Sequence, residues 1–147
     1  MSVLGRFLWC ALDVGLGRSY GRTGEDTQDC VRFVVSTLRG MYPGIDMTPH
    51  SDVLHLNGQS VGSLANMERL EDLGVGARVQ DCDEPGVYAL QCWRGGSGHA
   101  FFLIRRRSGA LWLCDFSPAD CDGLEPIEWR DIVARWPSRA MVRLTRP

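Results

Sequence analysis

The chain has 147 residues, of which 44% are hydrophobic and 23% charged, and this composition is typical of one globular domain over residues 1–147. The formal net charge of −2 gives no reason to expect a nucleic-acid partner or an anionic membrane, because such binding depends on excess positive charge. The short basic run Arg105-Arg106-Arg107 is interpreted as the solvated end of a strand.

The first predicted element is a helix near the N-terminus. Its apolar residues recur at helical spacing: Leu4, Phe7, Leu8, Ala11 and Leu12. Asp13 interrupts this apolar stretch and no small-residue cleavage site follows, so we expect part of the fold and not a signal peptide. No segment approaches the ~20 apolar residues that a membrane-spanning helix needs.

A polar, glycine-rich loop over residues 15–28 leads into a second predicted helix over residues 29–39. Asp29 is a suitable N-cap, and Gly40 with the Pro43-Gly44 pair is expected to end this helix. Two shorter helices are expected over residues 51–56 and 64–73.

The pattern changes after Arg78 to short runs rich in β-branched and aromatic residues. Residues 86–93, 99–106 and 110–116 are predicted to form three antiparallel strands joined by tight turns. A helix over residues 126–136 and a strand over 139–145 follow. Helices first and strands afterwards predict an α+β fold, with the helices packed on one antiparallel sheet.

The six cysteines form no C-x-x-C pair and no zinc-type spacing with the three histidines. We therefore expect no metal site and no cofactor. Cys10, Cys92 and Cys114 lie within apolar runs and are expected to be buried and reduced. Cys82 and Cys121 lie in loop-like contexts and are the two that look available for pairing.

Cys30 is the candidate nucleophile. It stands in the segment TQDCVRFVV, between polar capping residues and the apolar face of the second helix. The free amides of a helix N-terminus favour a thiolate, and they can also stabilise the oxyanion that forms when a carbonyl is attacked. A cysteine here can equally be the first buried residue of the helix. Both interpretations stay open at this point.

His99 is the candidate general base. It follows a glycine-rich turn and opens an apolar strand, so it is expected to be both rigid and reachable from solvent. A strand-end histidine with a satisfied hydrogen bond is the alternative interpretation. His50 and His55 lie in or near a short polar helix, where we expect them to face solvent or to cap.

Asp115 is the candidate third member. It ends the strand ALWLC, and a hairpin with the strand of His99 would make the two residues near cross-strand neighbours. A carboxylate after an apolar run costs free energy unless it has a partner. Asp120 and Asp122 are further acids, which we expect to be solvated.

The order of these motifs resembles that of the NlpC-type cell-wall peptidases of the papain-like superfamily. Tyr20 precedes the cysteine by ten residues, the run DCVRFV opens the helix, and GHAFFLI looks like the strand that carries the family's histidine. Residues 41–52 and 84–90 look like its "G-I-x-L-P" and "P-G-D-L" segments. The resemblance covers roughly residues 16–117 and implies a papain-like fold with a catalytic triad of Cys30, His99 and Asp115.

The resemblance also implies a function and the surroundings of the triad. It implies hydrolysis of peptidoglycan stem peptides by a γ-D-glutamyl, meso-diaminopimelate-type endopeptidase or a related amidase. Gln28 or a main-chain amide near the cysteine would complete the oxyanion hole, and further substrate-binding positions would be Tyr20, Asp29, Val31 and Arg32. The family usually has Ser and Gly at the last two of these positions, so the substrate preference is expected to differ.

Other classes of protein fit the same residues. The order Cys, His, Asp is also similar to transglutaminase-like domains and papain-fold toxins, which would deamidate, crosslink or cleave a protein target. A papain-like fold used only for binding, with Cys30 as a packing residue, is a third hypothesis. On the leading hypothesis, the protein is made in the cytoplasm of a bacterium without a signal peptide. It then reaches the periplasm or cell wall through a secretion system or phage, with an immunity or delivery protein as a possible partner.

Overall fold

The computed structural model describes residues 1–15, 19–20, 27–28, 30–47, 55–56, 59–94, 97–116 and 123–147. Within these residues the chain has an α+β fold with four helices and a six-stranded antiparallel sheet, in agreement with the predicted fold class. The helices are α1 (Val3–Gly15), α2 (Cys30–Met41), α3 (Val61–Asp72) and α4 (Trp129–Arg135).

The large sheet has the strand order β5-β10-β6-β7-β8-β9, and every neighbouring pair is antiparallel. Its strands are β5 (Gly76–Arg78), β6 (Gly86–Arg94), β7 (Ser97–Arg105), β8 (Leu111–Asp115), β9 (Gly123–Pro126) and β10 (Ser138–Leu144). The predicted meander is confirmed as β6-β7-β8. The last strand of the chain, β10, lies between β5 and β6 and so completes the interior of the sheet.

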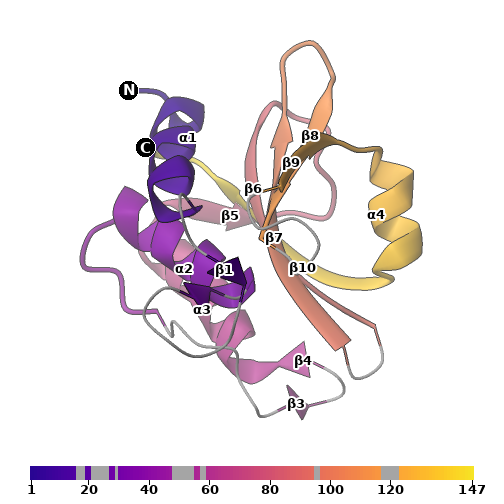
Figure 1. Cartoon of the computed structure of the whole chain (residues 1–147), viewed down its shortest axis with the longest axis horizontal. Coiled ribbons are helices and arrows are strands. Elements are labelled where there is room, and N and C mark those ends of the chain that lie inside the picture. Colours follow the sequence, from indigo (N-terminus) through magenta and orange to yellow (C-terminus); the bar gives the residue numbers. More distant parts are fainter. Residues whose placement is uncertain are drawn as a thin grey trace.

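Helices cover both faces of the sheet, with α1, α2 and α3 on one side and α4 on the other (Figure 1). Alternate strand residues join the two resulting clusters. Ala100 and Phe102 belong to the cluster of the first three helices, whereas Phe101 and Leu103 pack with Ile132 of α4. Because both faces of the central strands are buried, their sequences run as continuous apolar stretches.

α1 and α2 pack closely against each other at Gly40. A Cβ at this position would lie 3.2 Å from the Cys10 sulfur, so a larger residue would push the helices apart. The expectation that Gly40 ends the second helix is therefore wrong, since its small size serves packing inside the helix. α2 ends at Met41, and the turn that follows contains Gly44 with a φ of 89°.

The buried face of α1 differs from the predicted stripe at one end. Phe7, Cys10 and Ala11 are buried as part of the first cluster, and the ring centroid of Phe7 lies 4.7 Å from that of Phe102. Leu12 is 70% exposed and Trp9 is 72% exposed. The prediction for Leu12 is wrong, because Cys10 and not Leu12 faces α2.

Two local predictions differ from the structure. Residues 55–56 were expected in a helix but form the strand β3 (His55–Leu56), which pairs with β4 (Gln59–Ser60); residues 51–54 lie outside the described residues. The sequence between these strands is Asn57-Gly58, a strong signal for a two-residue hairpin. The helix expected from residue 126 begins only at Trp129, because residue 126 is the last of β9.

The described cysteines are free thiols and all of them are buried. This confirms the prediction for Cys10, Cys92 and Cys114. The expectation that Cys82 is accessible is wrong, because it is 1% exposed and its sulfur accepts a 3.6 Å hydrogen bond from Nη2 of Arg105. Cys121 lies outside the described residues. None of the helices found in the described ranges is long and apolar enough to cross a bilayer.

Candidate active site

Cys30 is the first residue of α2, and its side chain is buried, with 8% of the residue exposed. α2 is held against the sheet by Phe33, whose ring lies 5.9 Å from that of Phe102 and 5.8 Å from that of Phe116. The amides in the first turn of a helix have no acceptor within the helix. The packing of α2 therefore fixes both the sulfur and a set of backbone donors beside it.

His99 lies near the start of β7, opposite Cys92 of β6. β8 pairs only with residues 102–105 of β7, so His99 lies beyond the end of that ladder. At this place the side chain of Cys30 acts on the imidazole, through hydrogen bonding and charge, as one of the groups that raise its pKa. The nucleophile and base that the sequence suggested are thus in contact.

Asp115 holds the other side of the imidazole. Its Oδ2 lies 3.1 Å from Nε2 of His99, and the two side chains are only 14% and 19% exposed. Since Phe102 pairs with Cys114, Asp115 is diagonal to His99 on the same face of the sheet. The predicted proximity of these two residues is confirmed, and Nδ1 is the ring nitrogen left to face a thiol.

The charge state of His99 follows from these neighbours. Burial lowers the pKa of its imidazole, but the hydrogen bonds with Asp115 and Cys30 and the charges of both groups outweigh burial. As a result, the pKa of His99 rises from 6.5 to about 9. The imidazole is therefore protonated at neutral pH. A protonated imidazole between a thiol and a carboxylate is the arrangement found around activated cysteine nucleophiles.

Two aromatic side chains lie against the imidazole. The ring centroid of Phe101 lies 5.2 Å from that of His99, and the ring of Trp136 lies 6.1 Å away at an interplanar angle of 26°. Trp129 and Trp136, seven residues apart in the sequence, both pack on the sheet in the cluster on the α4 side. The contact with His99 was not anticipated, because a seven-residue spacing gives no signal for which strand residue lies beneath.

Tyr20 lies next to the segment that precedes α2. β1 (Ser19–Tyr20) and β2 (Thr27–Gln28) form a parallel pair in which Tyr20 is opposite Gln28, two residues before Cys30. The structure describes these two residues by their backbones only, and Asp29 lies outside the described residues. Their assignment to substrate binding or to an oxyanion hole stays a prediction.

The two residues after Cys30 differ in burial. Val31 is 8% exposed and packs in the core near Gln91 and Ala100, whereas Arg32 is half-buried. Of the two, Arg32 is thus the one that is partly open to solvent.

The side chains of the remaining polar candidates are not among those that the structure describes. His50, Asp120 and Asp122 lie outside the described residues, and His55 is described by its backbone only. Within the described part of the chain, no group of three or more His, Cys, Asp or Glu side chains is arranged to hold a metal ion.

Comparisons of the chain with protein-family models, with curated proteins and with solved structures found no match.

Proposed function

We propose that the chain is a cysteine hydrolase in which Cys30 is the nucleophile, His99 the general acid and base, and Asp115 the residue that orients the imidazole. The observation that carries this proposal is that Nε2 of His99 lies 3.1 Å from Oδ2 of Asp115, while Asp115 and Cys30 together raise the pKa of the imidazole to about 9. The three residues come from α2, β7 and β8, so only the folded chain brings them together.

The first half of the reaction is acyl transfer. The Cys30 thiolate attacks a carbonyl carbon, and a C–S bond forms as the carbonyl oxygen gains negative charge. The free amides in the first turn of α2 are placed to donate to this oxyanion. His99 then gives its proton to the leaving nitrogen, and the C–N bond breaks to leave a thioester on Cys30.

The second half of the reaction regenerates the enzyme. His99, now neutral, takes a proton from water, and the resulting hydroxide attacks the thioester carbon. The C–S bond breaks, the carboxylic acid product leaves, and the thiolate is again paired with an imidazolium. Throughout both halves, the hydrogen bond of Asp115 to Nε2 holds the ring so that its other nitrogen faces the sulfur.

The proposed fold is papain-like, and the proposed substrate is a peptide bond in a peptidoglycan stem peptide. A nucleophile that opens a helix, with its base and acid on two successive antiparallel strands, supports this fold. The sequence resemblance to the NlpC-type peptidases supports the substrate. The enzyme would act in the periplasm or cell wall after delivery by a secretion system or phage.

Digestion of purified sacculi tests the reaction and its substrate together. Wild-type protein is expected to release muropeptides whose masses identify the bond that is cleaved, and Cys30→Ala is expected to release none. If the sacculi stay intact and a protein target is deamidated, crosslinked or cleaved, the result would support a transglutaminase-like or toxin enzyme instead. Equal muropeptide release by Cys30→Ala would show that Cys30 is not the nucleophile.

A further inference from the structure

A large cavity lies at the opposite end of β7 from His99. It has a volume of about 520 Å³, and its lining includes Arg105 at the end of that strand. Six residues separate His99 from Arg105, which corresponds to about 20 Å along an extended strand. The cavity is therefore separate from the candidate active site, and the proposed hydrolase uses none of its residues.

Four arginines line this cavity, and no acidic residue does: Arg105, Arg106, Arg107 and Arg143. The guanidinium of Arg105 donates to two neutral carbonyls, those of Cys82 at 2.8 Å and Gly109 at 2.7 Å, so its charge is held in place without being neutralised. Arg106 and Arg107 are exposed, and among the described residues neither has an ion-pair partner. The basic run Arg105-Arg106-Arg107 was interpreted as a solvated strand end, and it also forms one wall of this cavity.

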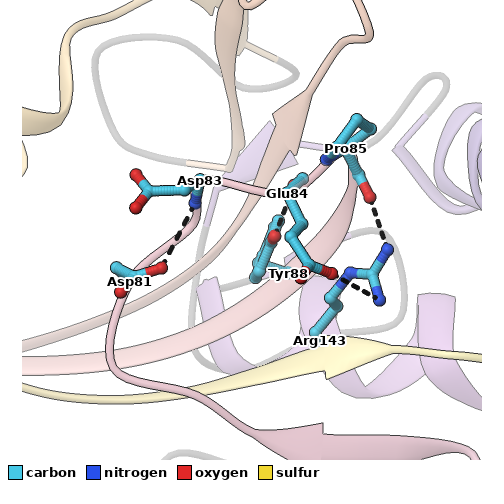
Figure 2. A network of polar contacts seen from close by, with 6 residues as sticks. All are labelled: Asp81, Asp83, Glu84, Pro85, Tyr88 and Arg143. Carbon is cyan, nitrogen blue, oxygen red and sulfur yellow. Dashed lines mark hydrogen bonds and ion pairs between the residues drawn. The ribbon is translucent and has the colours of Figure 1, made fainter.

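Arg143 approaches from β10, which is separated from β7 by β6, and is fixed by the segment before β6 (Figure 2). Its Nη2 donates to the carbonyl of Pro85 at 2.6 Å, and its Nη1 lies 3.5 Å from a carboxylate oxygen of Glu84. That carboxylate is 76% exposed, so it screens the arginine only weakly. The same segment is braced by Tyr88, whose hydroxyl donates to the carbonyl of Glu84.

One hydrogen-bond donor of Arg143, its Nε, is unsatisfied among the described residues. Its Nε is buried and has no hydrogen-bond partner among the described residues. A Cβ at position 86 would lie 2.9 Å from this nitrogen, so Gly86 provides the room in which the guanidinium lies. A buried donor without an acceptor costs free energy, so the other contacts of Arg143 hold its guanidinium here in spite of that cost.

The remaining walls suit an anion with an apolar part. Ser2, Val3 and Leu4 contribute the first turn of α1, which contains no acidic residue and adds a partial positive charge. Ile104 and Leu144 add apolar surface. The volume lies within the range of about 300–1,000 Å³ that is usual for small-molecule sites.

We propose that this cavity binds a small molecule that carries more than one phosphate charge. Four guanidinium groups against one exposed carboxylate leave more positive charge than a single carboxylate ligand would balance. Guanidinium groups also match phosphate oxygens in pairs of parallel hydrogen bonds. The phosphate belongs either to a soluble molecule or to a lipid headgroup, and the same arginines would bind both.

Titration calorimetry with inorganic pyrophosphate at physiological ionic strength tests this site. The double variant Arg106→Ser/Arg107→Ser removes two exposed side chains and should keep its thermal midpoint. Arg135→Ser is the matched control, because Arg135 is an exposed arginine on α4, on the other face of the sheet. We expect one pyrophosphate per chain, binding at least about tenfold weaker in the double variant, and unchanged binding in the control.

Sedimentation with phosphatidylcholine vesicles, with and without phosphatidic acid, distinguishes the two sources of phosphate. Co-sedimentation that needs both phosphatidic acid and the two arginines assigns the site to a lipid headgroup. Pyrophosphate binding without co-sedimentation assigns it to a soluble ligand. The proposal is overturned if wild-type protein binds neither probe, or if the double variant binds as wild type does, or if Arg135→Ser weakens binding equally. None of these outcomes depends on hydrolase activity.

Discussion

Two cysteines are neighbours of His99, and their surroundings differ sharply. Cys92 is its partner across the β6-β7 ladder, is fully buried at 0% exposure, and burial raises the pKa of its thiol to about 12 in spite of the nearby charge of Arg139. Cys30 opens a helix, and its side chain is one of the groups that raise the pKa of the His99 imidazole. The difference teaches that proximity to a histidine is not enough, because burial can keep a neighbouring thiol protonated, as it does for Cys92.

Replacing each cysteine with alanine should give the largest difference in hydrolysis rate between the two. Cys30→Ala is expected to lower the rate of substrate hydrolysis by about 10⁴-fold or more, because no thiolate remains to attack. Cys92→Ala removes a thiol that stays protonated, so it should keep most of the activity and lose only stability. Initial rates on sacculi, with circular dichroism as the check on folding, measure both. A folded Cys92→Ala protein as inactive as Cys30→Ala would contradict the assignment.

Removal of the imidazole should erase the distinction between the two thiols. His99→Ala is expected to reduce hydrolysis by about 10²–10⁴-fold, because the leaving group is no longer protonated. In wild-type protein, iodoacetamide at pH 6 should modify Cys30, the proposed nucleophile, and leave Cys92 unmodified, since burial raises the pKa of the Cys92 thiol to about 12. Peptide mapping of the alkylated protein gives both rates. Equally fast modification of Cys30 in His99→Ala would rule out the pairing.

Asp115→Asn should weaken the same pairing without removing either reacting group. We expect a loss of about 10²–10⁴-fold in hydrolysis, because the imidazole is held less firmly and its positive charge is less well stabilised. The pKa of His99 is raised to about 9, so the proton needed by the leaving group is present below this pH and is lost as the pH rises through it.

The pH profile of the wild-type rate should therefore fall on the alkaline side near pH 9. In Asp115→Asn one of the causes that raise the pKa is gone, and the alkaline fall should move to lower pH. Asp83→Asn is a matched control, because Asp83 precedes β6 at the end where Gly86 pairs with Arg105, and His99 lies near the other end of β7. If the alkaline side of the pH–rate profile is unchanged in Asp115→Asn, the Asp115 carboxylate has no part in setting the pKa of His99.

The smallest effect is expected for the ring that stacks on His99. Trp136→Leu keeps apolar volume but removes the aromatic face above the imidazolium, which is worth about 1 kcal/mol, or a several-fold loss in rate. Trp129→Leu is the control, because Trp129 packs in the same cluster but faces Arg139, whose guanidinium carbon lies 5.0 Å from the ring centroid. Equal losses of rate in the two variants would indicate general destabilisation of the α4 side.

The features that could be predicted from the sequence are the local ones. The meander β6-β7-β8 was predictable because its strands are buried on both faces and are therefore continuous in apolar residues. The same hairpin register placed Asp115 near His99, so two of the three site residues followed from one turn. Cys30 followed from the polar-to-apolar change at the start of α2.

The features that could not be predicted depend on distant parts of the chain. β5 and β9 have no β-branched residues, and they are strands because β10 and β8 offer them partners. The insertion of β10 between β5 and β6 is likewise a matter of long-range pairing. Trp136 reaches His99 only because α4 covers the second face of the sheet (Figure 1).

The most direct measurement of the central claim is the titration of the His99 imidazole by nuclear magnetic resonance, in wild-type protein, Cys30→Ala and Cys92→Ala. The account predicts a pKa of about 9 for the wild type and for Cys92→Ala, and a clearly lower pKa for Cys30→Ala. A wild-type pKa near 6.5, the ordinary value for histidine, would contradict the ion pair. So would a pKa that stays unchanged when the Cys30 thiol is removed.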